Sequence, residues 1–322
     1  MVAAFKREVV GISTASALGS RPCAYQIGPS VLRQVTRFAS GNQVRWERPI
    51  ACVHGKREQS LIALNRRVRS EAESLARRGQ RFVLFSGDHS AAIGMWGGVM
   101  NALAKTDRRL GLIWIDAHMD AHTTATSPSG NPHGMPIAAL LGVQDPLLAR
   151  IRDGQQLINP EQLHIVGIHS YEMVEKRQLD NLGVTYYMMN RVRQLGLRQT
   201  LLRCWRSLLD DCDVIGISID LDAIDPIDAP GVTVPVAHGI RLQELLEALA
   251  YLPAPLALEI SEYNPHADRS LRTVRSIPAI AKAVFSRSGR RRGFSARAGL
   301  QAVGSTRQYP EPQPFRSATS GR

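Results

Sequence analysis

The chain alternates between short apolar runs rich in β-branched residues and longer stretches with helical periodicity. Short apolar runs are typical of buried strands, whereas apolar residues three and four positions apart indicate amphipathic helices. The predicted strands are residues 6–12, 81–86, 110–115, 162–168, 184–188, 213–219 and 255–260. The predicted helices are residues 28–36, 59–79, 89–104, 134–141, 172–182, 191–210, 241–250 and 269–285. Strands that alternate with helices form βαβ units, so the pattern predicts one α/β domain around a mainly parallel sheet.

Acids and histidines come directly after four of these predicted strands. The four segments are Gly87-Asp88-His89-Ser90, Asp116-Ala117-His118-Met119-Asp120, Asp220-Leu221-Asp222 and Glu262-Tyr263-Asn264-Pro265. In open parallel sheets, ligands bind in the crevice at the carboxyl ends of the strands. We therefore expect the four segments to contribute to one functional site.

Two of the segments place their acids and histidine at alternate positions, Asp116-x-His118-x-Asp120 and Asp220-x-Asp222. Alternate side chains of an extended segment point to the same side. With His89 they offer two imidazoles and four carboxylates, a donor set that favours Mn²⁺ or a similar divalent ion. Six ligands exceed the needs of one zinc ion and suit two ions bridged by carboxylates. One such residue alone is more often a helix cap, but the repetition favours a metal site.

The composition excludes several other classes of protein. The chain has 322 residues, of which 44% are hydrophobic, enough for a sizeable globular core. Its four cysteines are scattered without a Cys-x-x-Cys pair, which argues against a disulfide framework and a cysteine-rich zinc site. No apolar run reaches the roughly 18 residues of a membrane span, and no secretory signal is visible. A cytoplasmic location is therefore expected.

The net charge of +12 is concentrated at one end of the chain. Residues 286–322 contain eight arginines and a single acid, Glu311, and so carry +7 of the total. We expect a catalytic domain over residues 1–285 and a basic, disordered tail over residues 286–322. Arg290-Arg291-Arg292 leaves open a tail that docks nucleic acid, an acidic partner or a membrane surface. Only Phe294 offers an aromatic platform beside it, so nucleic acid is not the expected partner.

The metal motifs resemble those of the ureohydrolase family, which includes arginase and agmatinase, and arginase is the more similar. The matching segments are residues 86–90 (SGDHS), 114–120 (WIDAHMD) and 218–226 (SIDLDAIDP), with further matches at residues 28–33 and 271–275. They occur in family order, and the resemblance covers about residues 5–285. It implies a three-layer α/β/α domain with a doubly wound, mainly parallel sheet. It also implies a homo-oligomer, a trimer or a hexamer.

The resemblance implies two Mn²⁺ ions and assigns their ligands position by position. His89 and Asp120 would hold one ion, and His118 and Asp222 would hold the other. Asp116 and Asp220 would bridge the pair. A hydroxide between the metals would attack the carbon of a guanidinium group, because two metals lower the pKa of a bridging water.

Three residues receive catalytic roles from the same resemblance. Asp120 would pass the proton of the hydroxide to the leaving amine. Glu262 would bind the guanidinium through paired hydrogen bonds, and His133 would shuttle a proton. The expected reaction is the hydrolysis of L-arginine to L-ornithine and urea.

The residues that would bind the rest of the substrate leave its identity open. They are His122, Ser127, Ser129, Asn131 and Glu172. Neutral donors and Glu172 at these positions fit the carboxylate and the amine of arginine. However, His122 stands where arginases generally have Asn, and Ser170 stands where many have an acid. Agmatine, guanidinobutyrate or another guanidino acid is the alternative substrate, and a metal-binding relative without turnover is a further alternative.

Overall fold

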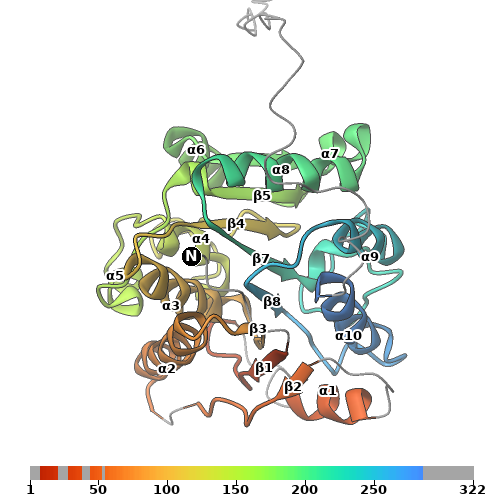
Figure 1. Ribbon diagram of the computed structural model, residues 1–322, viewed down its shortest axis with the longest axis horizontal. Helices are drawn as coiled ribbons and strands as arrows, with labels where there is room; N and C mark the ends of the chain where they lie inside the picture. Colours follow the sequence, from red (N-terminus) through yellow and green to blue (C-terminus); the bar gives the residue numbers. More distant parts are fainter. Residues whose placement is uncertain (1–7, 21–27, 38–43, 53–54, 286–322) are drawn as a thin grey trace, which may run out of the picture. The chain divides into compact units, whose positions relative to one another are not determined.

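The structure, a computed structural model of the protein, describes residues 8–20, 28–37, 44–52 and 55–285. A parallel sheet with the strand order β2-β1-β3-β8-β7-β4-β5-β6 runs through the described part (Figure 1). The predicted basic tail, residues 286–322, lies outside these ranges, so the domain boundary at residue 285 stays a prediction. Across the described ranges, no helix is both long and apolar enough to cross a bilayer.

The elements of the sheet and its covering helices follow the predicted alternation. The strands are β1 (Val9–Ser13), β2 (Val44–Trp46), β3 (Arg81–Phe85), β4 (Leu110–Ile115), β5 (Leu163–Ile168), β6 (Thr185–Met188), β7 (Val214–Asp220) and β8 (Ala257–Ser261). The α-helices are α1 (Gly28–Arg37), α2 (Arg57–Arg77), α3 (Ala92–Ala104), α4 (Pro136–Leu140), α5 (Pro146–Arg152), α6 (Met173–Leu182), α7 (Met189–Leu195), α8 (Leu197–Asp211), α9 (Leu242–Tyr251) and α10 (Arg272–Phe285). Short 3-10 helices include η2 (His89–Ala91), η3 (Pro132–Gly134), η4 (Pro160–Gln162) and η5 (Leu221–Ala223).

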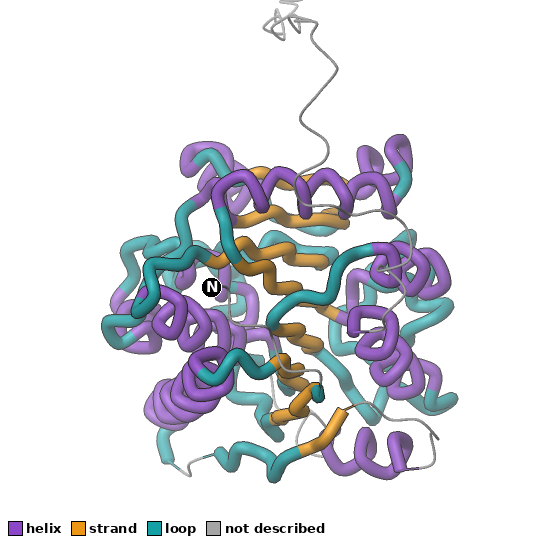
Figure 2. The backbone as a smooth tube through the Cα atoms, in the orientation of Figure 1, coloured by secondary structure: helices purple, strands orange, loops and turns teal. Residues whose placement is uncertain are grey.

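Each face of the sheet packs against its own set of helices and forms a separate apolar core. The domain therefore has three layers, with the sheet in the middle. Phe82 and Leu84 of β3 pack into a core with residues of α2 and α3. Val83 and Phe85 of the same strand point the other way, into a core with residues of α8, α9 and α10. Figure 2 shows the strands between helices on both sides. Strands buried on both faces are apolar throughout, and this confirms the predicted α/β fold with a parallel sheet.

Three local features differ from the prediction. The helix predicted over residues 191–210 is wrong as a single helix, because Gly196 separates α7 from α8 with φ of +80°, a conformation that L residues rarely adopt. The edge strand β2 was not predicted, since three residues are too few to show a period. Helix α5 was also missed, although Asp145 followed by Pro146 is a typical helix start, and the Asp145 side chain accepts a hydrogen bond from Leu148 N.

The path of the chain brings the four polar segments together. After β4, β5 and β6, the chain returns and inserts β7 and β8 between β4 and β3. The register aligns four residues in one row across these strands, namely Phe85, Ile260, Ile219 and Ile115. Asp116 and Asp220 each lie one residue beyond this row, at the carboxyl edge of the sheet. The predicted functional site therefore lies at the carboxyl ends of four adjacent central strands, as expected for an open parallel sheet.

Candidate metal centre

The structure brings all six predicted metal-binding side chains together at this edge. His89 lies in η2 after β3, and Asp222 lies in η5 after β7. The other four come from the end of β7 and the segment after β4, namely Asp220, Asp116, His118 and Asp120. Five of the six side chains are buried, whereas that of His118 is 25% exposed and leaves an approach from solvent. The arrangement is compatible with metal binding, and the ligand roles stay a prediction.

Three carboxylates surround one ring nitrogen of His89. The Nδ1 atom lies 3.0 Å from Asp220 Oδ2, 3.1 Å from Asp120 Oδ2 and 3.3 Å from Asp116 Oδ2. A single N–H can satisfy only one of these oxygens, and Nδ1 makes no hydrogen bond within the described residues. A cation shared by the nitrogen and the oxygens would satisfy all of these atoms at once.

A second group of ligand atoms lies on the other side of Asp116. His118 Nδ1 is 3.1 Å from Asp222 Oδ2 and 3.6 Å from Asp116 Oδ1. Asp116 therefore turns one oxygen toward each histidine, which is the geometry of a bridging carboxylate. Asp220 Oδ2 also faces His89, and the Oδ1 atoms of Asp116 and Asp220 each accept the backbone N–H two residues on, that of His118 and that of Asp222.

Buried polar atoms without partners mark where cations would bind. His89 Nδ1, Asp120 Oδ2 and Asp222 Oδ1 are buried and lack a hydrogen bond among the described residues. Such atoms are costly unless a ligand or an ion satisfies them. They belong to both groups around Asp116, so the residues present fit two divalent cations rather than one.

The electrostatics of the carboxylates also favour cation binding. Burial, with the charge of Asp116 added to it, raises the pKa of Asp120 to about 7. Burial likewise raises the pKa of Asp222 to about 6, although the nearby His118 opposes the shift. For Asp220, burial and the charges of Asp222 and Asp116 raise the pKa well above its ordinary value. Crowded carboxylates of this kind repel one another, and a divalent cation would relieve the repulsion.

A buried carboxylate beneath the site, which was not predicted from the sequence, orients His89. Ser218 Oγ lies 2.9 Å from His89 Nε2 and donates a 2.9 Å hydrogen bond to Glu259 Oε2. Because Ser218 donates to the carboxylate, it accepts from His89 Nε2–H, and the lone pair of Nδ1 then faces the aspartates. Trp96 Nε1 and Ser86 Oγ also donate to Glu259, which is fully buried in β8. The available signal was an acid inside an otherwise apolar predicted strand.

The catalytic candidates Glu262 and His133 contact each other beside the metal-binding residues. Glu262 Oε1 accepts the backbone N–H of His89 at 2.9 Å and lies 3.1 Å from His133 Nδ1. Burial lowers the pKa of His133, but the negative charge of Glu262 outweighs it and raises the pKa to about 9. Glu262 and Asp120 both have positive φ, +66° and +48°, which is uncommon outside glycine and is often found at functional sites.

The comparisons with known proteins agree with this geometry. A model of the arginase family matches residues 8–286. The chain belongs to the arginase family. It is 37% identical to an arginase of Bacillus caldovelox over 230 residues, which cover 70% of this chain and 76% of that protein. This arginase-like ureohydrolase is therefore an enzyme, a hydrolase that acts on carbon–nitrogen bonds.

Solved structures of arginases have the same fold. The crystal structure of an arginase from Bacillus subtilis superposes with a TM-score of 0.78 at 30% identity, covering 87% of this chain and 98% of that one. An Entamoeba histolytica arginase in complex with L-ornithine gives a TM-score of 0.79 at 25% identity, covering 88% and 99%. These values support the single three-layer domain described above.

The predicted substrate-binding residues of this arginase-family chain lie in two groups at the rim. Ser127 and Ser129 accept the backbone N–H groups of Gly130 and Asn131, and their hydroxyl oxygens lie 3.4 Å apart, so at least one hydroxyl keeps its proton to donate to a ligand. The second group contains His122 and Glu172, and His122 Nε2 lies 3.1 Å from Glu172 Oε2.

Glu175, which the sequence analysis did not select, completes the second group. Its Oε2 lies 3.4 Å from His122 Nε2, and its Oε1 accepts the backbone N–H of Ala121. The backbone N–H of Glu172 donates to Glu175 Oε2 in the capping box that starts α6. The spacing of two glutamates at a helix start was the available signal.

Proposed function

We propose that the protein hydrolyses L-arginine to L-ornithine and urea with two Mn²⁺ ions. The observation that carries this proposal is Asp116, whose two oxygens face two separate histidine–aspartate groups lined with unpartnered buried atoms. A donor set of four carboxylates and two imidazoles suits manganese better than zinc. When bound, two such cations supply Lewis acidity and lower the pKa of a coordinated water.

The ligand assignment follows the two groups. His89 Nδ1 and Asp120 Oδ2 would hold the first ion, and His118 Nδ1 and Asp222 would hold the second. Asp116, which turns one oxygen toward each histidine, would bridge the two ions. Asp220, whose Oδ2 faces His89, would be the second bridging carboxylate.

The remaining residues of the site bind the guanidinium and move protons. The buried Glu262 carboxylate would pair with the cationic guanidinium, an interaction strengthened by the low local dielectric. Asp120 would take the proton released by the attacking water and give it to the departing amine nitrogen. His133, whose side chain is 22% exposed, would exchange that proton with bulk water.

The rim residues support an amino-acid substrate. Ser127, Ser129 and Asn131 offer neutral donors for an α-carboxylate, and Glu172 offers an acceptor for an α-amine. The Entamoeba histolytica arginase was solved with L-ornithine, which carries both of these groups.

Urea release from the Mn²⁺-loaded protein tests the proposal. L-arginine, agmatine and 4-guanidinobutyrate should be compared at equal concentration, because agmatine lacks the carboxylate and guanidinobutyrate lacks the amine. We expect the highest kcat/KM with L-arginine. A preference for agmatine or guanidinobutyrate would contradict the substrate, and urea from none of the three would contradict the enzyme activity.

Two properties implied by the family are also proposed for this chain. We expect a homo-oligomer, a trimer or hexamer, which light scattering of the purified protein measures directly. We expect a cytoplasmic location, which fractionation of the producing cells tests.

A further inference from the structure

Arg57, the first residue of α2, joins two loops at the rim of the site. Its Nε donates to Leu18 O at 2.7 Å, and its Nη2 donates to Ser20 O at 2.9 Å. The same Nη2 donates to the side-chain oxygen of Asn131 at 3.0 Å. The guanidinium of Arg57 therefore donates hydrogen bonds both to the segment after β1 and to the loop that carries the predicted carboxylate-binding residues.

The chemistry of the guanidinium fixes which way the Asn131 amide points. A guanidinium only donates hydrogen bonds, so the Asn131 atom that faces it has to be Oδ1. The Nδ2 amino group then lies on the other side of the amide. No group among the described residues accepts a hydrogen bond from it, although the residue itself is 7% exposed. Without Arg57, the amide would be free to turn and present its oxygen instead.

We propose that Arg57 is a positioning residue that orients Asn131 so that its N–H groups bind the carboxylate of the substrate. This inference rests on the proposed function, because it needs a substrate that carries a carboxylate. An oxygen presented at the same place would repel the carboxylate. With Arg57 in place, Asn131 favours binding of an amino acid over binding of the amine that lacks its carboxylate. Without Arg57, Asn131 could disfavour the amino acid.

The proton-shuttle candidate beside Asn131 is held in place by other contacts. His133 N donates to Gly19 O at 2.9 Å, and Gly19 N donates to Asp88 Oδ2 at 2.8 Å. A side chain at Gly19 would clash with Asp88 Oδ1, so this segment is packed directly against the Asp88 turn. Arg57 contacts the carbonyls on either side of Gly19, but Gly19 and His133 keep these two hydrogen bonds of their own, so loss of Arg57 should weaken substrate binding more than turnover.

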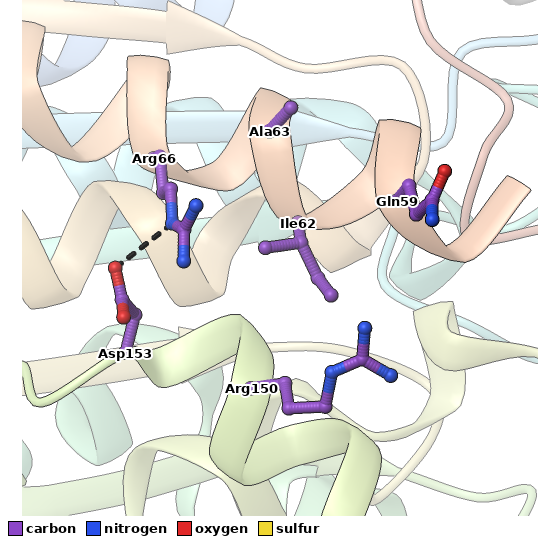
Figure 3. A pocket seen from close by; sticks show the side chains of 6 residues that line it. All are labelled: Gln59, Ile62, Ala63, Arg66, Arg150 and Asp153. Carbon is purple, nitrogen blue, oxygen red and sulfur yellow. Dashed lines mark hydrogen bonds and ion pairs between the residues drawn. The ribbon is translucent and has the colours of Figure 1, made fainter. Parts of the chain in front are cut away.

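Helix α2 offers a matched control. Arg66 lies on the same helix and forms an ion pair of 2.8 Å with Asp153, beside a pocket of about 280 Å³ between α2 and α5 (Figure 3). The figure shows its guanidinium directed toward Asp153, which follows α5. Arg66→Gln removes the same charge from the same helix without touching the loop of Asn131.

The test compares KM and kcat for L-arginine with those for agmatine. In Arg57→Gln, we expect KM for L-arginine to rise about 10-fold, the factor typical of a lost hydrogen bond to a charged group. We expect kcat to stay within about 3-fold and KM for agmatine within about 2-fold, because uniform binding of the carboxylate alone is lost. Arg66→Gln should match the wild type. Equal increases in KM for both substrates, or no increase, would overturn the inference.

A double-mutant cycle separates orientation of Asn131 from a general effect on the fold. If Arg57 acts through Asn131, the KM of Arg57→Gln/Asn131→Ala should equal that of Asn131→Ala. Additive effects would overturn the inference. Should Arg57→Gln unfold, Arg57→Lys keeps the charge but loses the forked donors, and the same substrate-dependent rise in KM is expected.

The outcome also distinguishes this inference from the proposed function. If the wild type hydrolyses L-arginine and Arg57→Gln is unchanged, only the inference fails. If the wild type releases urea from agmatine alone, the proposed substrate is wrong and the inference fails with it, since no carboxylate is bound.

Discussion

Two clusters of histidine and acids lie in the same site and differ in how their atoms are satisfied. The metal cluster, built around His89, Asp116 and His118, has three buried ligand atoms without partners. The rim cluster consists of His122, Glu172 and Glu175, and its facing atoms also lie within metal-binding distance of one another.

In the rim cluster, however, the polar atoms have hydrogen-bond partners among neighbouring side chains and backbone N–H groups. His122 has Glu172 on one nitrogen and Thr126 on the other, and Glu175 accepts two backbone N–H groups. The same residue types therefore leave unpartnered buried atoms in one place and form a closed polar network in the other. The comparison teaches that residue type and proximity are insufficient, and that unpartnered buried atoms indicate where a cation fits.

Removal of the carboxylate shared by the two metal groups should have the largest effect. Asp116→Asn should lower the Mn²⁺ content below two per chain and reduce kcat by about 10³-fold, the loss expected when several kcal/mol of metal stabilisation disappear. Elemental analysis and urea release measure the two effects. Asp180→Asn, which breaks an exposed pair with Lys176, is the control and should retain both ions. Two ions in active Asp116→Asn protein would refute the bridging assignment.

A smaller loss is expected from the carboxylate that orients His89. Glu259→Gln keeps the size of the side chain but removes the charge that accepts from Ser218 and Trp96. Manganese affinity should fall about 10- to 100-fold, as is usual when the partner of a ligating histidine is changed. Titration of the metal-free protein with Mn²⁺ measures it. Ser86→Ala removes only the longest contact to Glu259, 3.3 Å, and should have a smaller effect. An unchanged affinity in Glu259→Gln would show that His89 is oriented without it.

A substitution in the rim cluster should leave the metal content unchanged and strengthen substrate binding. His122→Asn removes the imidazole that contacts Glu172 and leaves the carboxylate for the α-amine of the substrate. We expect two Mn²⁺ per chain as in the wild type and a KM for L-arginine lower by about 5-fold, the value of one hydrogen bond. Metal content and steady-state kinetics check this. Loss of an ion from His122→Asn would show that the rim cluster is part of the metal site, and would contradict the difference between the two clusters.

The smallest effect is on the pH dependence of stability. Burial, together with the neighbouring Glu172, raises the pKa of Glu175 to about 8. An acid whose pKa is raised by folding stabilises fully below its unfolded pKa of about 4.5, and this contribution is lost as the pH rises toward 8. Glu175→Gln cannot ionise, so its unfolding free energy relative to the wild type should increase from pH 5 to pH 8. The slope should be at most about 1.4 kcal/mol per pH unit.

Urea denaturation of both proteins at several pH values gives this difference directly. A difference that stays constant between pH 5 and pH 8 would contradict the buried, protonated state of Glu175.

Much of the fold followed from local patterns. Each strand predicted from its apolar run is present, and both faces of the sheet are covered as the alternation with helices indicated. Boundaries failed where the signal was short or interrupted, as at β2 and at Gly196. The candidate site was found because acids and histidines after apolar runs are rare, and these residues keep their chemistry wherever the strands are placed.

Residue type and spacing along the chain were sufficient to predict the α/β class, the six metal-binding candidates and the family resemblance. The position of β7 and β8 between β3 and β4 could be read only from the folded chain, since pairing between distant strands leaves no local period. It also decided the contacts between residues far apart in the chain, such as Ser218 with Glu259 and Arg57 with Asn131. Residue type predicted which atoms could bind, and the packing of the chain determined which of them are left to do so.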